Sequence, residues 1–373
     1  MPCSSKIGQG AKEINDGENN KMKKSLCATI LASAIASVAT TGVSAQELTK
    51  LNIMVSNERA TSEYPVYVAR ELGFYEDEGL DVNFLASSTT VPYLAFLSNG
   101  DAELVMLDPA QTLQAVETEQ PISIIYEYMQ LAPEALVVPE SSDIMSIADL
   151  KGKTIGMASD RDQVTVNIAL DTVGMTSDDV RSVVIGDSIP LIVSQMRDGN
   201  IDAYAGGSNE TNGFESSGIA LRHLTPPEIS QAPGNNMTIW GPRKEELRPV
   251  ITGFLRAWNK ASTAAMLDIK AVAGMAKKFV PEQWEDPAQG TAILEQSAYE
   301  LLLQRTRLRG EPQPDVWENL QATYLKQGEI SKIYDPVTFL DGSFIEAAND
   351  YTTADVKEAL KEWREANQEY LTP

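Results

Sequence analysis

The sequence predicts a two-lobed α/β protein, in which each lobe is a mostly parallel sheet flanked by helices and a helical region follows. Three observations support this fold class. Strand and helix patterns alternate with short connections, their order repeats once, and the pattern beyond residue 247 is helical. A length of 373 residues suits two domains of ordinary size, and a hydrophobic content of 43% suffices for their cores.

Residues 1–45 are expected to be a leader and not part of the fold. Three lysines flank Met22, an apolar run spans residues 26–38, and small residues precede a cleavage site near Ala45. The run is too short and too rich in Ala, Ser and Thr for a membrane anchor. Because residues 1–21 are polar and partly acidic, we expect translation to start at Met22. The leader itself predicts that the protein is exported to the periplasm.

Composition excludes several kinds of site in residues 46–373. Both cysteines, Cys3 and Cys27, precede this segment, so we expect no disulfide, no cysteine-based metal site and no cofactor. The segment has 25 Lys and Arg against 50 Asp and Glu, a net charge of −25. Such a surface repels nucleic acid and anionic lipid, and we expect a soluble monomer.

The first lobe is assigned to residues 46–138. Its helices are predicted to begin at prolines, and Gly73 ends the first of them. Its strands are predicted at 51–55, 80–85, 103–107, 122–126 and 134–138.

The second lobe, residues 142–238, repeats the order with strands at 153–157, 180–185 and 201–205. Residues 239–373 are expected to cross back to the first lobe and to end in helices. The last helix shows apolar residues at the spacing i, i+3, i+4, i+7 from Val356, with Thr352 as its cap.

Ligands of open α/β sheets bind beyond the carboxyl ends of the strands, where loops lead into helix N-termini. The loops of both lobes are therefore expected to face one another around a small molecule. The predicted contacts are polar or aromatic residues of these loops and strand ends: Asn57, Glu58, Tyr64, Ser88, Thr89, Asp108, Glu127, Tyr128, Asp160, Arg161, Gln163, Asn209, Glu210 and Trp240. A cap or a core position is the alternative role for several of them, Asp108 and Thr89 above all.

Charge narrows the expected ligand class. Carboxylates predominate in the loops assigned to the cleft, whose only cations are Arg59 and Arg161. Because carboxylates accept hydrogen bonds from amine and ring N–H groups, a neutral or cationic nitrogen-containing ligand is favoured. A sulfonate or nitrate site would instead need facing cations.

The segment 64–82, YPVYVARELGFYEDEGLDV, resembles the signature of NMT1/THI5-like solute-binding proteins. Further matches are LSNGD at 97–101, DLKGKTIG at 149–156 and DGNIDA at 198–203. The resemblance covers about residues 50–245. It implies a type II periplasmic binding fold and the substrate-binding component of an ABC importer, partnered by a permease and an ATPase of the inner membrane. Known ligands of the family include sulfonates, taurine, nitrate and thiamin-pyrimidine precursors, and the last class fits the charge argument.

The alternatives are anion binding and catalysis like that of the family's fungal thiamin-pyrimidine synthase. That chemistry relies on histidine and a cysteine-rich motif, whereas residues 46–373 contain only His223 and no cysteine. The expectation from the sequence is therefore that the chain is not an enzyme.

Overall fold

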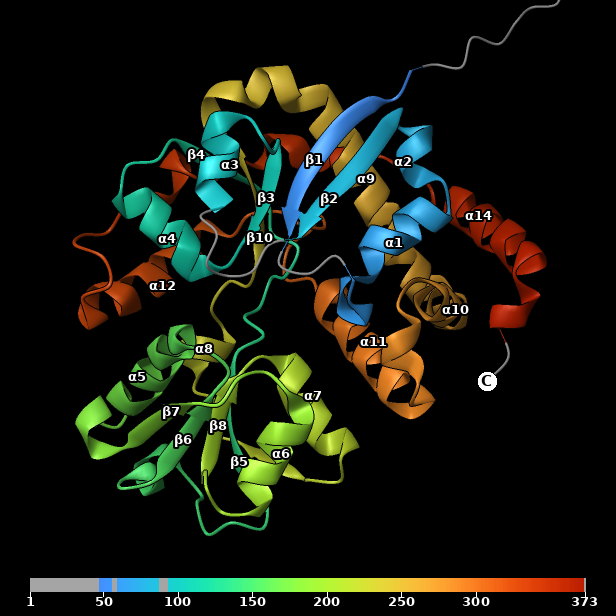
Figure 1. Cartoon of the computed structure of the whole chain (residues 1–373). Helices are drawn as coiled ribbons and strands as arrows, with labels where there is room; N and C mark the ends of the chain where they lie inside the picture. The colour runs from blue at the N-terminus through green and yellow to red at the C-terminus, as the bar shows by residue number, and fades with distance from the viewer. Residues whose placement is uncertain (1–46, 56–58, 87–92, 372–373) are drawn as a thin grey trace, which may run out of the picture. The chain divides into compact units, whose positions relative to one another are not determined.

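The computed structural model describes residues 47–55, 59–86 and 93–371, and it contains two five-stranded sheets (Figure 1). The first sheet has the order β2-β1-β3-β10-β4. Its strands are β1 Thr49–Val55, β2 Leu80–Ala86, β3 Leu104–Leu107, β4 Ile122–Tyr126 and β10 Asn236–Trp240.

The second sheet has the order β7-β6-β8-β5-β9. Its strands are β5 Ala135–Pro139, β6 Thr154–Met157, β7 Arg181–Val184, β8 Ala203–Gly206 and β9 Leu221–His223. We call each sheet with its flanking helices a lobe. The predicted two-lobed α/β architecture is thus confirmed.

Both sheets are mixed, not mostly parallel as expected. In the first, β1 pairs in parallel with β2 and β3, while β10 runs antiparallel to β3 and β4. In the second, β6 pairs in parallel with β7 and β8, while β5 runs antiparallel to β8 and β9. The antiparallel strands β5 and β10 are those through which the chain enters one sheet after leaving the other.

The predicted lobe boundaries differ from the strand pairing at two points. Strand β5 belongs to the second sheet although the boundary at 138 assigned it to the first lobe, and β10 belongs to the first sheet although it begins before 238. The chain therefore crosses between sheets twice, within residues 127–134 and 224–235. We call these segments the two crossings.

Helices cover both sheets (Figure 1). In the first lobe, Pro65 and Pro109 lie in the first turns of their helices, and Gly73 adopts φ 73° at the end of α1. The helices up to the second crossing are α1 Tyr64–Glu71, α2 Phe74–Asp77, α3 Tyr93–Asn99, α4 Pro109–Glu117, α5 Gln163–Asp171, α6 Ile189–Arg197, α7 Ser208–Ser216 and α8 Pro227–Ser230.

The C-terminal third is helical, as predicted. Its helices are α9 Lys244–Leu267, α10 Ile269–Phe279, α11 Pro287–Leu302, α12 Pro314–Gln327, α13 Ile345–Ala348 and α14 Thr353–Ala366. Helix α9 packs against α1 and α14, and Phe254 and Trp258 of α9 are buried in the largest core cluster. Thr352 caps α14 by accepting a hydrogen bond from the Asp355 N–H at 3.3 Å.

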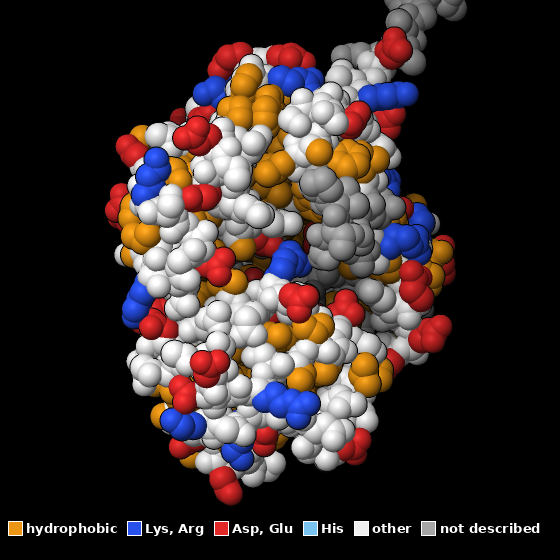
Figure 2. Space-filling model, turned by 60° about the vertical axis from the view of Figure 1, so that its left-hand side comes forward, with side chains coloured by type: hydrophobic (Ala, Val, Ile, Leu, Met, Phe, Trp, Pro, Cys, Tyr) orange, Lys and Arg blue, Asp and Glu red, His pale blue; other side chains and the backbone are white. Residues whose placement is uncertain are grey.

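Helix α12 contacts the second lobe as well as the first. Its Trp317 and Leu320 pack in a core cluster that includes Leu113 of α4 and Val166 of α5. Across the described part of the chain, no helix has the length and apolar character that crossing a bilayer requires. Acidic side chains are scattered over the face drawn in Figure 2 and do not gather in one large patch.

Candidate functional site

The two crossings are hydrogen-bonded to each other and form the junction at which the site is built. The Met129 N–H donates to the Asn235 carbonyl at 3.1 Å, and the Gly234 N–H donates to the Met129 carbonyl at 3.1 Å. A third bond joins the Ala132 N–H to the Ala232 carbonyl at 3.0 Å. The crossings are therefore tied together as a pair, and residues from both of them, such as Tyr128, Glu134 and Asn235, line the cavity described next.

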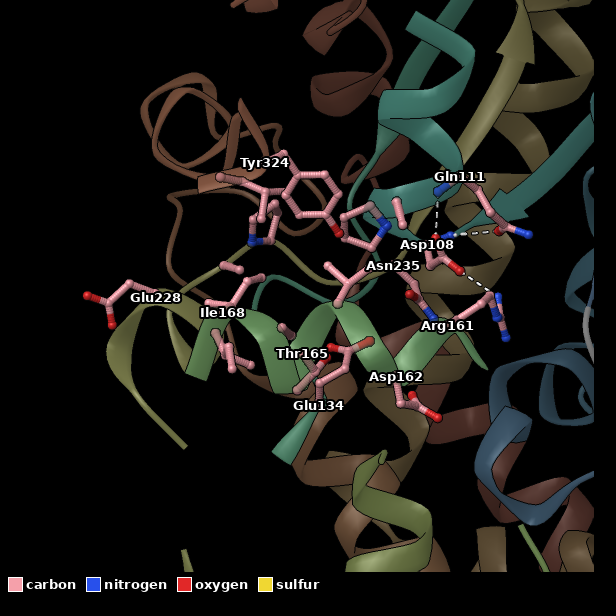
Figure 3. A pocket seen from close by; sticks show the side chains of 18 of the residues that line it. Asp108, Gln111, Glu134, Arg161, Asp162, Thr165, Ile168, Glu228, Asn235 and Tyr324 are labelled. Carbon is pink, nitrogen blue, oxygen red and sulfur yellow. Dashed lines mark hydrogen bonds and ion pairs between the residues drawn. The ribbon is translucent and has the colours of Figure 1, made fainter. Parts of the chain in front are cut away.

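A cavity of about 220 Å³ lies at this junction (Figure 3). The first lobe, the second lobe, the crossings and α12 all contribute to its lining. Its polar and aromatic lining residues are Tyr93, Asp108, Gln111, Tyr128, Glu134, Arg161, Asp162, Thr165, Glu228, Asn235 and Tyr324. This volume is below the roughly 300 Å³ at which sites for drug-sized ligands begin, so it suits a small organic molecule.

Asp108 is fixed at the carboxyl end of β3, as the N-cap of α4. Its Oδ1 accepts from the Gln111 N–H at 2.7 Å, and the Gln111 side chain accepts from the Asp108 N–H at 3.1 Å. This reciprocal pair is a capping box, which satisfies two helix N–H groups that would otherwise have no partner. Asp108 therefore caps α4, as the alternative from the sequence proposed, and it also lines the cavity.

Arg161 approaches Asp108 from the second lobe. It lies in the turn Asp160–Asp162, which leads from β6 into α5, and its Nη1 is 2.7 Å from Asp108 Oδ2. The Arg161 side chain is 50% exposed and that of Asp108 is 21% exposed, so solvent screens the pair only in part. Figure 3 shows this ion pair at one side of the cavity.

Two further carboxyls surround this ion pair. Burial, assisted by the charges of Asp108 and Asp162, raises the pKa of Glu134 to about 7, although a backbone hydrogen bond and Arg161 oppose the shift. Burial likewise raises the pKa values of Asp108 and Asp162, although hydrogen bonds and Arg161 oppose the shift. Glu228 also lines the cavity, but Figure 3 shows its carboxyl pointing away from the others. Among the described lining residues, four carboxyl groups thus stand against one guanidinium.

A second cavity of about 170 Å³ shares Tyr128 and Asn235 with the first. Glu63, Ser208 of α7 and Glu300 of α11 also line it. Burial raises the pKa of Glu63 to about 7 and also raises that of Glu300. Among the described residues that line this second cavity there is no Lys or Arg.

The structure brings three of the predicted contact residues together in the first cavity: Asp108, Tyr128 and Arg161. Glu210 lies on α7 near the second cavity, where burial raises its pKa to about 7 and the charge of Asp162 adds to the effect. Asp160 is exposed, and the Gln163 amide donates to Asn167 within α5 at 2.9 Å. Asn57, Glu58, Ser88 and Thr89 lie outside the described residues, and Asn209 is placed on α7 by its backbone alone.

Three predicted contacts occupy the core instead. Tyr64 is fully buried on the inward face of α1, and Trp240 packs in core clusters at the end of β10. Glu127 is 1% exposed, because its carboxylate accepts hydrogen bonds from Gln313 and from the Trp317 indole. In the sequence, core residues and cavity-lining residues can both be aromatic or lie at a strand end, so neither feature distinguishes the two roles.

Sequence reasoning missed Glu134, Asn235 and Tyr324 as lining residues. Glu134 and Asn235 belong to the crossings and not to loops before helices. The dipeptide Pro233-Gly234, a strong turn signal, could have indicated the second crossing. Tyr324 comes from α12, and nothing in its local sequence points to a cavity whose other polar lining residues lie between Tyr93 and Asn235.

Comparison with known proteins supports the fold and the family. The profile of the family described as NMT1/THI5 like matches residues 60–268. The periplasmic aliphatic sulphonate binding protein of Escherichia coli is similar over 78% of this chain and 91% of its own, with a TM-score of 0.59 and 14% identity. The periplasmic nitrate-binding protein of Synechocystis PCC 6803 is similar over 87% and 91%, with a TM-score of 0.56 and 11% identity. The expected family and type II periplasmic binding fold are confirmed.

The curated relatives correct one expectation. The 4-amino-5-hydroxymethyl-2-methylpyrimidine phosphate synthase of Schizosaccharomyces pombe is 22% identical over 153 residues, 41% of this chain and 44% of the relative. Three further fungal relatives, 26–27% identical, carry the same name. The chain spans about half the length of the curated relatives it matches. Because these relatives are named as enzymes, the prediction that the chain is not an enzyme is overturned, although the structural neighbours are mainly binding proteins.

Proposed function

Because the chain belongs to the NMT1/THI5-like family, we propose that it is the substrate-binding component of an ABC import system. In this proposal residues 46–373 act in the periplasm after cleavage near Ala45. They bind a small organic solute between the lobes and deliver it to a permease driven by an ATPase of the inner membrane. The similarity of fold to periplasmic sulphonate- and nitrate-binding proteins supports the transport role.

The proposed ligand is a neutral or cationic nitrogen-containing compound such as an aminopyrimidine. One observation carries this choice: the carboxyls of Asp108, Glu134 and Asp162 line the first cavity, whose single described cation, Arg161, is already paired. Carboxylates accept hydrogen bonds from amine and ring N–H groups, and they repel sulfonate or nitrate. Tyr93, Tyr128 and Tyr324 supply aromatic faces on which a flat or cationic ligand can pack.

A thermal-shift experiment on purified residues 46–373 tests the ligand class. The probes are 4-amino-5-hydroxymethyl-2-methylpyrimidine, benzamidinium, taurine and nitrate. A ligand at one hundred times its Kd stabilises the folded state by about 2.7 kcal/mol, so specific binding raises the melting temperature. The pyrimidine or benzamidinium should stabilise the protein, and Glu134→Gln should reduce the shift while the exposed control Glu329→Gln should not. Stabilisation by taurine or nitrate alone would reject the proposed ligand class.

The transport role has its own test. If the adjacent genes encode a permease and an ATPase, these two proteins are reconstituted in vesicles, and uptake of the bound solute is measured with and without residues 46–373. Uptake that needs the protein supports the proposal, and uptake that does not need it contradicts the transport role.

Synthesis of a pyrimidine phosphate is the second candidate function, favoured by the names of the curated relatives. His223, the histidine of the chain, is exposed on β9 and pairs with Val137 at the edge of the second sheet. Mass spectrometry of the incubated protein for a pyrimidine phosphate product separates the two functions.

A further inference from the structure

The ion pair between Arg161 and Asp108 joins the two lobes across the first cavity. Asp108 follows β3 of the first sheet, and Arg161 follows β6 of the second. Among the described residues, it is the ion pair that links a loop of one sheet directly to a loop of the other. The guanidinium of Arg161 thus occupies the Asp108 carboxylate, which is the group that a cationic ligand in this cavity would bind.

The two partners differ in how they are held. Asp108 is held by its capping box with Gln111, so its Oδ2 has a fixed position. Arg161 has a half-exposed side chain, and its long chain can move into solvent at small cost. An incoming cation would therefore displace the guanidinium and leave the carboxylate in place.

Both oxygens of the Asp108 carboxylate already accept hydrogen bonds, so Arg161 and a cationic ligand would compete for it. Asp108 Oδ1 accepts from the Gln111 N–H, and Oδ2 accepts from Arg161. A ligand N–H group that approaches Oδ2 competes directly with Arg161 Nη1. Glu134 also lines this cavity and has no capping role, so it offers the same ligand a second carboxyl.

We infer that Arg161 is a specificity-determining residue: it competes with a cationic ligand for Asp108, and its ion pair with Asp108 holds the two lobes together until the ligand takes its place. This inference rests on the proposed function. It assigns to Arg161 a role opposite to that of an anion receptor, because removal of the guanidinium should strengthen cation binding.

Calorimetric titration of benzamidinium into residues 46–373 tests the competition. Arg161→Gln should bind benzamidinium roughly fivefold more tightly than wild type, the factor that corresponds to about 1 kcal/mol for a partly exposed ion pair. Asp108→Asn should bind it more weakly. The matched control Arg307→Gln removes an exposed ion pair with Glu346, neither of which lines the cavity, and should leave the affinity unchanged. Equal or weaker binding by Arg161→Gln overturns the inference.

A ligand-free measurement tests the link between the lobes. Residues 46–373 lack cysteine, so Ser98→Cys on α3 and Ser194→Cys on α6, both exposed, accept one spin label each. Arg161→Gln and Asp108→Asn should lengthen or broaden the distance distribution between the labels, and Arg161→Lys should restore it in part. The distribution in Arg307→Gln should match that of the parent.

The two failures are distinguishable. A wild-type protein that binds neither benzamidinium nor the pyrimidine overturns the proposed ligand class. An unchanged distance distribution in Arg161→Gln overturns the inference by itself, whether or not the wild type binds a cation.

Discussion

Glu127 and Trp317 are joined by a buried hydrogen bond of 2.8 Å from the indole Nε1 to the carboxylate, which ties the start of the first crossing to α12. The same carboxylate accepts from the Gln313 N–H at 3.0 Å and from the Gln313 amide at 2.7 Å. Helix α12 also places Tyr324 at the first cavity. This bond therefore connects the junction between the lobes to one wall of the site.

Glu127→Ala should lower the free energy of unfolding by about 3 kcal/mol, because it leaves three buried donors without an acceptor. Urea unfolding monitored by tryptophan fluorescence measures the change. The control Glu329→Ala, at an exposed position just beyond α12, should stay within about 0.5 kcal/mol of wild type. A loss from Glu127→Ala as small as that of the control would contradict the anchoring role.

Gly234→Ala should destabilise the pairing of the two crossings. A Cβ at Gly234 would lie 2.4 Å from the Leu131 carbonyl oxygen and 2.7 Å from that of Met129, and backbone atoms cannot move aside cheaply. The expected loss is about 2 kcal/mol in the free energy of unfolding. Gly342→Ala is the matched control, since its nearest neighbour would be Pro312 Cδ at 3.9 Å. Equal stability of the two variants in urea would show that the crossings can separate freely.

Glu119→Gly should stabilise the protein. Glu119 lies two residues beyond the end of α4 with φ 55°, a left-handed conformation that a side chain disfavours. Glycine removes this strain but adds freedom to the unfolded chain, which leaves a gain of about 0.5 kcal/mol. Glu119→Ala keeps the strain and loses the charge. If alanine stabilises as much as glycine does in thermal unfolding, the cause is electrostatic and the conformational explanation fails.

The ligand-free protein should lose stability as pH rises from about 4.5 to about 7, because burial raises the pKa values of Glu63 and Glu134 to about 7. A carboxyl with a raised pKa stabilises the fold while it is protonated. This contribution is complete below the ordinary value of 4.5 and is lost as pH rises through about 7. Melting temperatures across this range measure the slope.

Glu134→Gln should flatten this pH dependence, since glutamine resembles the protonated carboxyl and does not ionise. Glu329→Gln, which alters an exposed group, should keep the wild-type slope. Identical slopes for Glu134→Gln and wild type would show that Glu134 does not titrate in this range.

Local sequence was sufficient for the elements and for part of the site. Proline at helix starts and glycine at helix ends marked α1 and α4, and the rule that ligands lie at strand carboxyl ends identified Asp108 and Arg161. Strand pairing was harder to predict, because an apolar run such as β5 has the same sequence pattern whichever sheet it joins. The sheet that receives it depends on contacts distant in the chain.

The remaining lining residues depend on such distant contacts too. Tyr324 reaches the cavity because α12 packs in one core cluster with α4 and α5. Glu127 is buried away from the cavity because Gln313 and Trp317 donate hydrogen bonds to its carboxylate. The residues next to Tyr324 and Glu127 in the sequence indicate neither of these contacts.

A crystal structure of residues 46–373 grown with benzamidinium tests the central claim most directly. The account predicts the ligand in the first cavity, with its nitrogens about 3 Å from carboxylate oxygens of Asp108 or Glu134 and its ring against a cavity tyrosine. A ligand bound outside the space between the lobes, or an occupied cavity with no carboxylate in contact with the ligand, would contradict it.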